Sequence, residues 1–261
     1  MTTEVSELDV ALAPCPDDTG VFRATRSVWL GDTDDRGRLR LDAVARYLME
    51  LAYEHLETVE DGHLHRAWIV KRTVIDMVRP IRFGERIRLR RWPSATSNRW
   101  CSMRVEIDSE SGGSISTDTF VINVDPADGH PTRMTDRFLA PMLSMTTEHR
   151  LRWRPALRER AAIDSPAMPF PLRFADLDLN RHVNYAIHWQ AVEEALAQRP
   201  ELHDQPYRAI VEHVGPILAG DSVTMRREST DTGLFLQLEV DGAARTLASV
   251  HRVLDGRAVR G

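Results

Sequence analysis

The residues best suited to chemistry lie between Phe174 and Glu194. Within nine residues of this segment, acidic, amide and imidazole side chains occupy every second position: Asp176, Asp178, Asn180, His182 and Asn184. In an extended segment, alternate side chains project to the same side, so we expect all five on one side. Apolar residues at helical spacing follow, and a helix N-terminus offers unpaired N–H groups and favours negative charge. Such a set could activate a water molecule and hold an oxyanion.

The same residue types also have ordinary structural uses. Asp and Asn before a helix commonly cap it or form turns, and a single His is more often structural than catalytic. Five such residues at one helix mouth nevertheless favour a functional site.

Composition excludes several other classes of protein. The chain has 261 residues, with 42% hydrophobic and 28% charged residues, as in an ordinary globular protein. A net charge of −5 argues against nucleic acid as a partner. The two cysteines, Cys15 and Cys101, are too few for a disulfide framework or a zinc site, so we expect no metal or cofactor. The first residues lack a signal pattern, and no apolar run approaches the ~18–20 residues of a membrane span. We therefore expect a cytoplasmic protein.

The pattern along the chain predicts two similar units. Residues 1–20 are an acidic tail, residues 21–125 a first unit, residues 126–166 a linker with some helix, and residues 167–261 a second unit. In the first unit we expect a strand, a helix and four strands, at Phe22–Leu30, Leu41–Thr58, Trp68–Met77, Arg86–Trp92, Trp100–Ile107 and Ile115–Val124. In the second unit the same order recurs at Phe170–Ala175, Asn184–Gln198, Tyr207–His213, Ser222–Arg227, Leu234–Val240 and Thr246–Val253.

The repeat is also visible in the letters. Asp32-Thr33-Asp34 matches Asp176-Leu177-Asp178 at an offset of 144 (176 − 32), and Val78–Leu89 matches Val214–Met225 at an offset of 136 (214 − 78). A long helix followed by antiparallel strands favours an α+β fold in which each sheet wraps around a central helix, the double hotdog arrangement. Joining the two sheets edge to edge would pair two otherwise exposed edges.

Laying one copy on the other indicates a single active site. At the offset of 144, Asn180 lies over Arg36 and His182 over Arg38. Arginine stays protonated and cannot serve as a general base, so we expect the site in the second half. For Asp34 and Asp76 of the first half, a turn, cap or ion pair is the better interpretation.

Glu212 lies over Asp76 at the offset of 136 and sits near a predicted strand end. Its carboxylate could meet the helix mouth of the same unit, or it could be a solvent-exposed acid. Composition alone leaves both readings open.

Three segments carry a resemblance to a known family. Asp176–Tyr185 (DLDLNRHVNY) resembles the D-x-D-x-N-x-H-V-N signature of acyl-acyl carrier protein thioesterases of plants and bacteria. Trp68–Trp92 is similar to the first-half strands of that family, and Ile210–Val223 to its second-half strand with a glutamate and the turn after it. The resemblance covers roughly residues 21–253.

This resemblance implies a double hotdog fold and hydrolysis of fatty acyl thioesters to free fatty acid and carrier thiol. It implies catalytic roles for Asp178, Asn180, His182 and Glu212. The plant enzymes often have Cys after the strand glutamate, whereas this chain has His213. A cysteine nucleophile at that position is therefore excluded, which favours direct attack by water.

A mechanism without metal or cofactor suits a thioester, which has a good leaving group. We assign Glu212 with Asn180 to activating the water. His182, oriented by Asp178, would stabilise the carbonyl oxygen together with backbone N–H groups of the following helix. The roles of Glu212 and His182 could be reversed.

The acyl chain requires an apolar slot, and an acidic carrier protein requires a basic surface. Residues of the first helix, Tyr47, Met49 and Leu51, with Trp68 and Ile69, are candidates for the slot, although core packing is the better interpretation for any one of them. For carrier docking, the candidates are Arg150, Arg152, Arg154, Arg158 and Arg160.

The main alternative is an acyl-CoA thioesterase of the same fold, and a second is a non-catalytic acyl-binding protein. A monomer and a homodimer are equally open.

Overall fold

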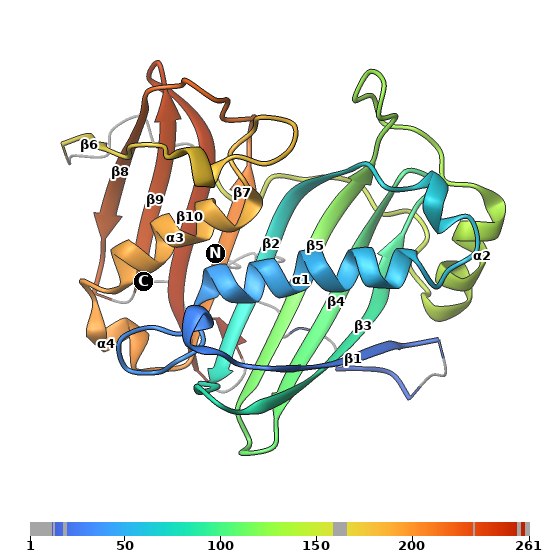
Figure 1. Cartoon of the computed structure of the whole chain (residues 1–261), viewed down its shortest axis with the longest axis horizontal. Helices are drawn as coiled ribbons and strands as arrows, with labels where there is room; N and C mark the ends of the chain where they lie inside the picture. The colour runs from blue at the N-terminus through green and yellow to red at the C-terminus, as the bar shows by residue number, and fades with distance from the viewer. Residues whose placement is uncertain are drawn as a thin grey trace, which may run out of the picture.

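One antiparallel sheet of eleven strands runs through the molecule, and two long helices cross one of its faces (Figure 1). The computed structural model describes residues 12, 14–17, 20–158, 166–231, 233–254 and 257–258. Most of the expected acidic tail and the expected docking residue Arg160 lie outside these residues.

The first half contains five strands and one long helix. After β1 (Phe22–Ser27) come a short 3₁₀ helix, η2 (Leu30–Asp32), and helix α1 (Leu41–Leu56). A second 3₁₀ turn, η3 (Gly62–Leu64), leads to four strands, namely β2 (Trp68–Arg79), β3 (Arg86–Thr96), β4 (Trp100–Ser109) and β5 (Ser114–Asn123). Within β3, Ile87 and Leu89 are fully buried while Arg86 and Arg88 are exposed, as their alternation predicts.

The connecting segment contains helix α2 (Asp136–Met145), whose Thr135 side chain caps it by accepting a hydrogen bond from the Phe138 N–H. The second half begins with β6 (Met168–Pro169) and η4 (Phe174–Asp176), followed by helices α3 (Tyr185–Leu196) and α4 (Pro200–His203). The remaining strands are β7 (Tyr207–His213), β8 (Val223–Ser229), β9 (Gly233–Val240), β10 (Ala243–Leu254) and β11 (Arg257–Ala258).

Strand order shows how the two halves join. Along the sheet it is β1-β3-β4-β5-β2-β7-β10-β9-β8-β6, with β11 paired to β10. The second half therefore repeats the order of the first in reverse, as a local two-fold relation between the halves requires. Pairing of β2 with β7 makes the sheet continuous, which confirms the expected edge-to-edge junction.

The main hydrophobic core lies between the helices and the sheet. Helices α1 (blue) and α3 (orange) lie in front of the strands in Figure 1. Leu48 and Leu51 of α1, Trp189 and Val192 of α3, and sheet residues such as Ile75 are buried together in this core. A smaller cluster, which includes Val74, Ile210 and Leu157, lies on the other face of the sheet. We call these the helix face and the outer face.

Most predicted bounds differ from the observed ones by a few residues, and three differences have a clear local description. The strand expected at Phe170–Ala175 is absent: the two-residue β6 ends just before it, Pro171 lacks the N–H group that a ladder needs, and η4 begins at Phe174. The strand expected at Phe22–Leu30 ends at Ser27, since the Asp32 carboxylate accepts a hydrogen bond from the Trp29 N–H and draws Leu30–Asp32 into a 3₁₀ turn. Helix α1 ends two residues before the predicted Thr58.

The side chain of Glu193 in α3 lies against the start of α1. Its carboxylate accepts a hydrogen bond from the Leu41 N–H at the start of α1, and burial raises its pKa to about 7. A carboxyl group whose pKa is raised on folding binds more protons in the folded state, so stability falls as pH rises from its ordinary value to about 7. Glu193→Gln should remove this loss and stabilise the protein at pH 8 by about 1–2 kcal/mol.

Urea unfolding at about pH 4 and at pH 8 measures the effect, with the exposed neighbour changed in Glu194→Gln as the control. An equal free-energy change for Glu193→Gln at both pH values would show that the carboxyl is not buried as described.

Candidate active site

The segment singled out in the sequence forms a tight turn between η4 and α3. Leu177 and Val183 pair as an isolated antiparallel bridge, and the Asp178 N–H donates to the His182 carbonyl over 2.8 Å. Arg181 has φ +61°, in the left-handed region. The expectation of an extended segment with all five polar side chains on one side is therefore wrong, because the chain reverses direction within it.

Three of the five polar side chains hold the backbone of this turn. Asp176 accepts from the Arg173 N–H at 2.8 Å, and Asn184 caps α3 by accepting from the Ala186 N–H at 3.0 Å. Asp178 Oδ1 accepts from the N–H groups of Asn180 and His182, both at 2.9 Å. Asp178 thus fixes the main chain of His182, rather than its imidazole as the sequence suggested.

The two remaining side chains, Asn180 and His182, are exposed to solvent. Within the described part of the chain, neither the Asn180 amide nor the His182 imidazole has a hydrogen-bond partner. Both are therefore available to a substrate or a water molecule. The N–H groups of Val183, Asn184 and Ala186 are already bonded, so the helix mouth offers fewer free donors than expected.

The first half contains the same turn with different occupants. Asp34 accepts from the N–H groups of Arg36 and Arg38, and Gly37 with φ +71° stands where the second half has Arg181. Equivalent hydrogen bonds also tie each turn to a loop between strands of its own half. The Leu39 N–H donates to the Ile81 carbonyl, and the Val183 N–H donates to the Ile217 carbonyl. The donors are 144 residues apart (183 − 39) and the acceptors 136 (217 − 81), the same two offsets as in the sequence repeat.

Arg38, which matches His182, donates to Asp34 at 2.8 Å and to Asp204 at 2.7 Å. The reading of Asp34 as a turn and ion-pair residue is confirmed.

Glu212 lies on the outer face of the sheet. Its neighbours Ile210 and Val211 belong to the outer cluster and the helix-face core respectively, and alternation puts Glu212 with Ile210. The carboxylate is buried and accepts from the Ala156 N–H at 2.8 Å, the Leu157 N–H at 3.1 Å and the Arg72 guanidinium at 3.1 Å. It is neither solvent-exposed nor in contact with the turn; it binds the linker to the β2–β7 junction.

A second ion pair repeats this arrangement across the junction. Arg208 of β7 donates from Nε and Nη2 to the two carboxylate oxygens of Asp76 of β2, each at 2.6 Å. At the offset of 136, Arg72 matches Arg208 and Asp76 matches Glu212. The antiparallel register places Arg72 opposite Glu212 and Asp76 opposite Arg208. The two halves thus exchange reciprocal ion pairs, and Asp76 is an ion-pair residue as expected.

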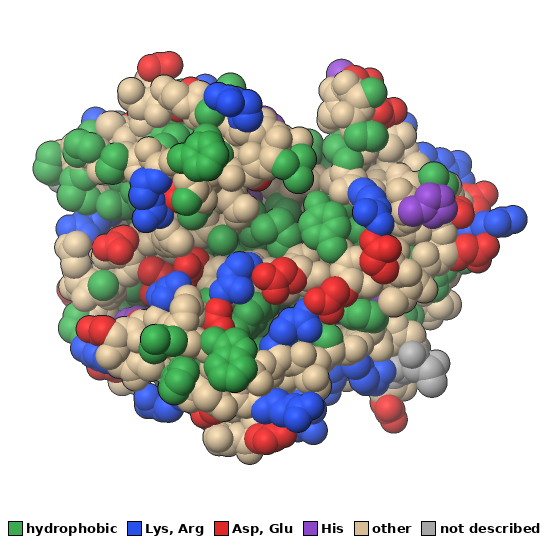
Figure 2. Space-filling model, viewed as in Figure 1, with side chains coloured by type: hydrophobic (Ala, Val, Ile, Leu, Met, Phe, Trp, Pro, Cys, Tyr) green, Lys and Arg blue, Asp and Glu red, His purple; other side chains and the backbone are tan. Residues whose placement is uncertain are grey.

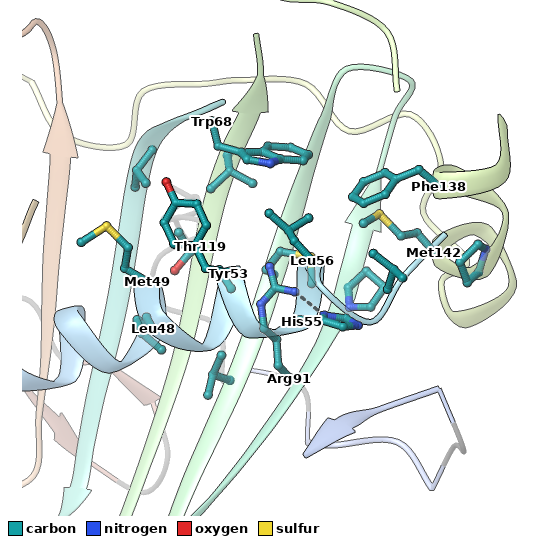
Figure 3. Close-up of a pocket in the computed structure, with 18 of the residues that line it drawn as sticks. Leu48, Met49, Tyr53, His55, Leu56, Trp68, Arg91, Thr119, Phe138 and Met142 are labelled. Carbon is teal, nitrogen blue, oxygen red and sulfur yellow. Dashed lines mark hydrogen bonds between the residues drawn. The ribbon is translucent and has the colours of Figure 1, made fainter. Parts of the chain in front are cut away.

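An apolar cavity of about 350 Å³ lies in the first half, between α1, the sheet and α2 (Figure 3). Figure 2 shows hydrophobic side chains gathered in a hollow between the two halves, above the position of α1 in Figure 1. Met49 and Trp68, two of the residues expected at an acyl slot, line this cavity. Ile69 is 42% exposed and is not among the lining residues, since β2 alternates and turns it to the outer face. Tyr47 and Leu51 are core residues.

The cavity reaches the second half through Tyr185, the first residue of α3. The Tyr185 hydroxyl donates to Thr73 Oγ1 at 2.6 Å, and the Thr73 hydroxyl donates to that of Thr119, another lining residue, at 3.3 Å. Tyr185 follows His182 by three residues, so the helix that begins after this turn contributes its first residue to the cavity wall.

Sequence reasoning overlooked a buried imidazole pair beside this point. His188 of α3 and His213 of β7 pack edge to face with ring centroids 4.6 Å apart. Burial lowers the pKa of His188 to about 4 and that of His213 well below its usual value, so both are neutral. His188 Nδ1 lies 2.8 Å from the Thr246 hydroxyl. Helical spacing from Tyr185 and the alternation of β7 place both rings on the helix face, a signal present in the sequence.

In the described part of the chain, no group of three or more His, Cys, Asp or Glu side chains is arranged to hold a metal ion. No described helix is long and apolar enough to cross a membrane.

One sheet shared by two halves, with a long helix against each half, defines a double hotdog fold. Residues 19–142 match the family model of the acyl-ACP thioesterase N-terminal domain, and residues 160–251 that of the C-terminal domain. The chain therefore belongs to the acyl-ACP thioesterase family, and it is a thioester hydrolase.

Proteins with a similar sequence or a similar fold are known. An uncharacterised protein of Mycobacterium tuberculosis is 40% identical over 247 residues, covering 95% of this chain and 98% of the relative. An acyl-ACP thioesterase from Bacteroides thetaiotaomicron has a similar fold, with a TM-score of 0.73 at 14% identity over 89% of this chain and 97% of that one. The 12:0-ACP thioesterase from Umbellularia californica has a TM-score of 0.68 at 14% identity, covering 90% and 97%.

The position of Glu212 predicts a structural cost for its replacement. In Glu212→Gln, one of the three donors around the carboxylate would face an amide NH₂ group. The variant should lose about 2–4 kcal/mol of unfolding free energy in urea. Asp76→Asn, the matched change in the other ion pair, should cost a similar amount.

A double-mutant cycle of Glu212→Gln with Arg72→Met isolates the pair and should give a coupling energy above about 1 kcal/mol. Wild-type stability of Glu212→Gln would contradict the junction role.

Proposed function

We propose that this enzyme hydrolyses fatty acyl-acyl carrier protein, releasing a free fatty acid and the carrier thiol. The observation that carries the proposal is the contact of Tyr185 with the apolar cavity. An acyl chain lying in the cavity and leaving it at Tyr185 brings its thioester to the turn that presents Asn180 and His182. Family membership supports the carrier as the donor of the acyl group. Such a hydrolase would act in fatty acid synthesis, in the cytoplasm.

We assign the exposed imidazole of His182 as the general base that activates the attacking water. Histidine is the most frequent general base in enzymes, and this ring is free of other hydrogen bonds within the described residues. Asn180, on the same turn, donates to the carbonyl oxygen as negative charge develops there. Asp178 positions both by holding their main-chain N–H groups. Between the two assignments left open by the sequence, this geometry favours His182 as the base.

Glu212, the fourth residue of the implied network, acts in this proposal from behind the sheet. Its carboxylate fixes the β2–β7 junction, and β7 leads directly into the loop that bonds to the turn through Ile217 and Ala219. We therefore propose Glu212 as a positioning residue.

Carrier docking is proposed for the arginine-rich part of the linker. Arg150, Arg152, Arg154 and Arg158 are exposed, and a run of unshielded guanidinium groups suits an acidic carrier surface. Acyl-CoA is the competing donor, and a non-catalytic acyl-binding role is the alternative from another class. The thiol-release assay described next distinguishes both alternatives from the proposed activity.

Thiol release from matched acyl carrier protein and acyl-CoA series tests the activity. We expect faster release from the carrier series and a loss of at least about 10²-fold in kcat for His182→Ala, with stability unchanged because the ring makes no hydrogen bond with a described residue. Leu179→Ala, a change at a fully exposed neighbour on the same turn, is the control. Carrier KM should rise steeply with salt if the linker arginines dock it.

Activity on CoA esters alone would show that acyl-CoA, and not the acyl carrier protein, is the substrate. Retained activity in His182→Ala would remove the ring from the mechanism, and acyl binding without thiol release would establish the binding-protein reading.

The cavity assignment predicts a shift in chain length. Met142 of α2 lines the end of the cavity away from Met49 and Thr119 (Figure 3). Met142→Trp should shorten the slot and lower kcat/KM for the longest accepted chains by about tenfold, with little change for short chains. The neighbouring Leu143→Trp, outside the cavity lining, is the control. An unchanged length profile in Met142→Trp would place the chain elsewhere.

A further inference from the structure

The apolar cavity contains one charged group. Arg91 of β3 shares its face with Ile87 and Leu89, so its side chain points beneath α1 rather than into solvent. Figure 3 shows the Arg91 guanidinium and the His55 ring side by side among the lining side chains. None of the described residues that line the cavity is Asp or Glu.

His55 does not balance the charge of Arg91. Arg91 Nη1 lies 2.5 Å from His55 Nδ1, and the other face of the ring is stacked on Phe22 with centroids 4.6 Å apart. Burial and the adjacent guanidinium lower the pKa of His55 to about 3, so its ring is neutral and accepts this hydrogen bond.

Arg91 itself remains protonated at neutral pH. Burial lowers its pKa to about 10, still far above neutrality. Among the described residues, its guanidinium has no partner except His55. A partly buried cation without a counter-ion loses hydration that the described fold does not replace, and an anion entering the cavity would offset that cost.

The free edge of the guanidinium has a defined shape. Because Nη1 is taken by His55, Nε and Nη2 remain, and these two N–H groups point in parallel. The same edge of Arg208 binds both oxygens of Asp76 within this protein. A carboxylate therefore fits the free edge of Arg91 in the same way.

We propose that the Nε–Nη2 edge of Arg91 binds a carboxylate carried at the end of an aliphatic chain that lies in the cavity. This inference rests on the proposed function for the direction of the chain. An acyl group with its thioester near Tyr185 would reach Arg91 with its far end, and would then be a chain that ends in a second carboxylate. The other source of the same chemistry is a free fatty acid, the reaction product, entering carboxylate first.

Calorimetric binding of three ten-carbon probes distinguishes these sources. They are the non-hydrolysable amide analogues of decanoyl-pantetheine and of sebacoyl-pantetheine, whose chain ends in a carboxylate, and free decanoic acid. We expect the sebacoyl analogue to bind wild-type protein at least roughly thirtyfold more tightly than the decanoyl analogue. Preference for free decanoic acid over both analogues identifies the product as the source.

Arg91→Met should abolish either preference while leaving decanoyl binding equal or tighter, because an apolar side chain then completes the slot. Arg88→Met removes a charge from the exposed face of the same strand and should change nothing. Arg91→Gln provides a second variant should Arg91→Met fail to fold, and the NMR signals of the His55 ring in the wild type report carboxylate binding beside it. Equal affinities for all three probes in the wild type, or a carboxylate preference that survives in both Arg91 variants, overturns the proposal.

These measurements need no turnover. Arg91-dependent carboxylate binding by a protein that releases no thiol would reject the proposed function and retain this inference. Thiol release without carboxylate preference would do the reverse.

Discussion

The reciprocal ion pairs between β2 and β7 are the constraint on which the arrangement of the two halves depends. Arg72 meets Glu212 and Arg208 meets Asp76, and both carboxylates are buried on the outer face. Breaking a buried pair costs about 3–5 kcal/mol, and a slip of one residue would turn these charges toward the helix face. The pairs therefore fix one register. That register makes a single sheet, sets α1 beside α3, and brings Tyr185 to the wall of a cavity that belongs to the other half.

Within this duplicated frame, the two copies of one turn have separate uses. Asp34 and Asp178 hold their turns by equivalent hydrogen bonds. The residue that each turn presents decides the outcome: Arg38 is held by Asp34 and Asp204, so it joins the first half to α4 of the second, whereas the His182 imidazole stays exposed. One copy thus supports the interface between the halves and the other is free for chemistry. The two copies therefore differ in what each presented side chain binds, while the hydrogen bonds that hold the two turns are the same.

The repeat made most of the fold predictable, because matching letters and alternating hydrophobic residues depend on local geometry alone. The alternation of polar residues from Asp176 to Asn184 wrongly indicated an extended segment. In the structure, Asp178 accepts hydrogen bonds from the N–H groups two and four residues later, so a turn gives the same every-second-residue pattern as a strand. The environment of Glu212 was not predictable, since the face that a strand-end residue occupies depends on pairing with β2. The alternation of Arg86, Arg88 and Arg90 was noted in the sequence, but Arg91 was overlooked. Arg91 is an even number of residues from Ile87 and Leu89, so it shares their face of the strand rather than the face of the other arginines. That parity was the available signal.

Arg91 and the two arginines of the β2–β7 junction differ in their partners, and this difference separates stability from recognition. On the outer face, Arg72 and Arg208 have carboxylate partners from the opposite half, so their charges are balanced by folding itself. On the helix face, the partner of Arg91 among the described residues is a neutral imidazole, and Arg91 lines a cavity. Folding leaves that charge unbalanced, and a ligand that reaches it gains the interaction that the protein lacks. Selectivity for a carboxylate would then arise from a deficit in the folded protein, in a cavity whose walls otherwise recognise only chain length.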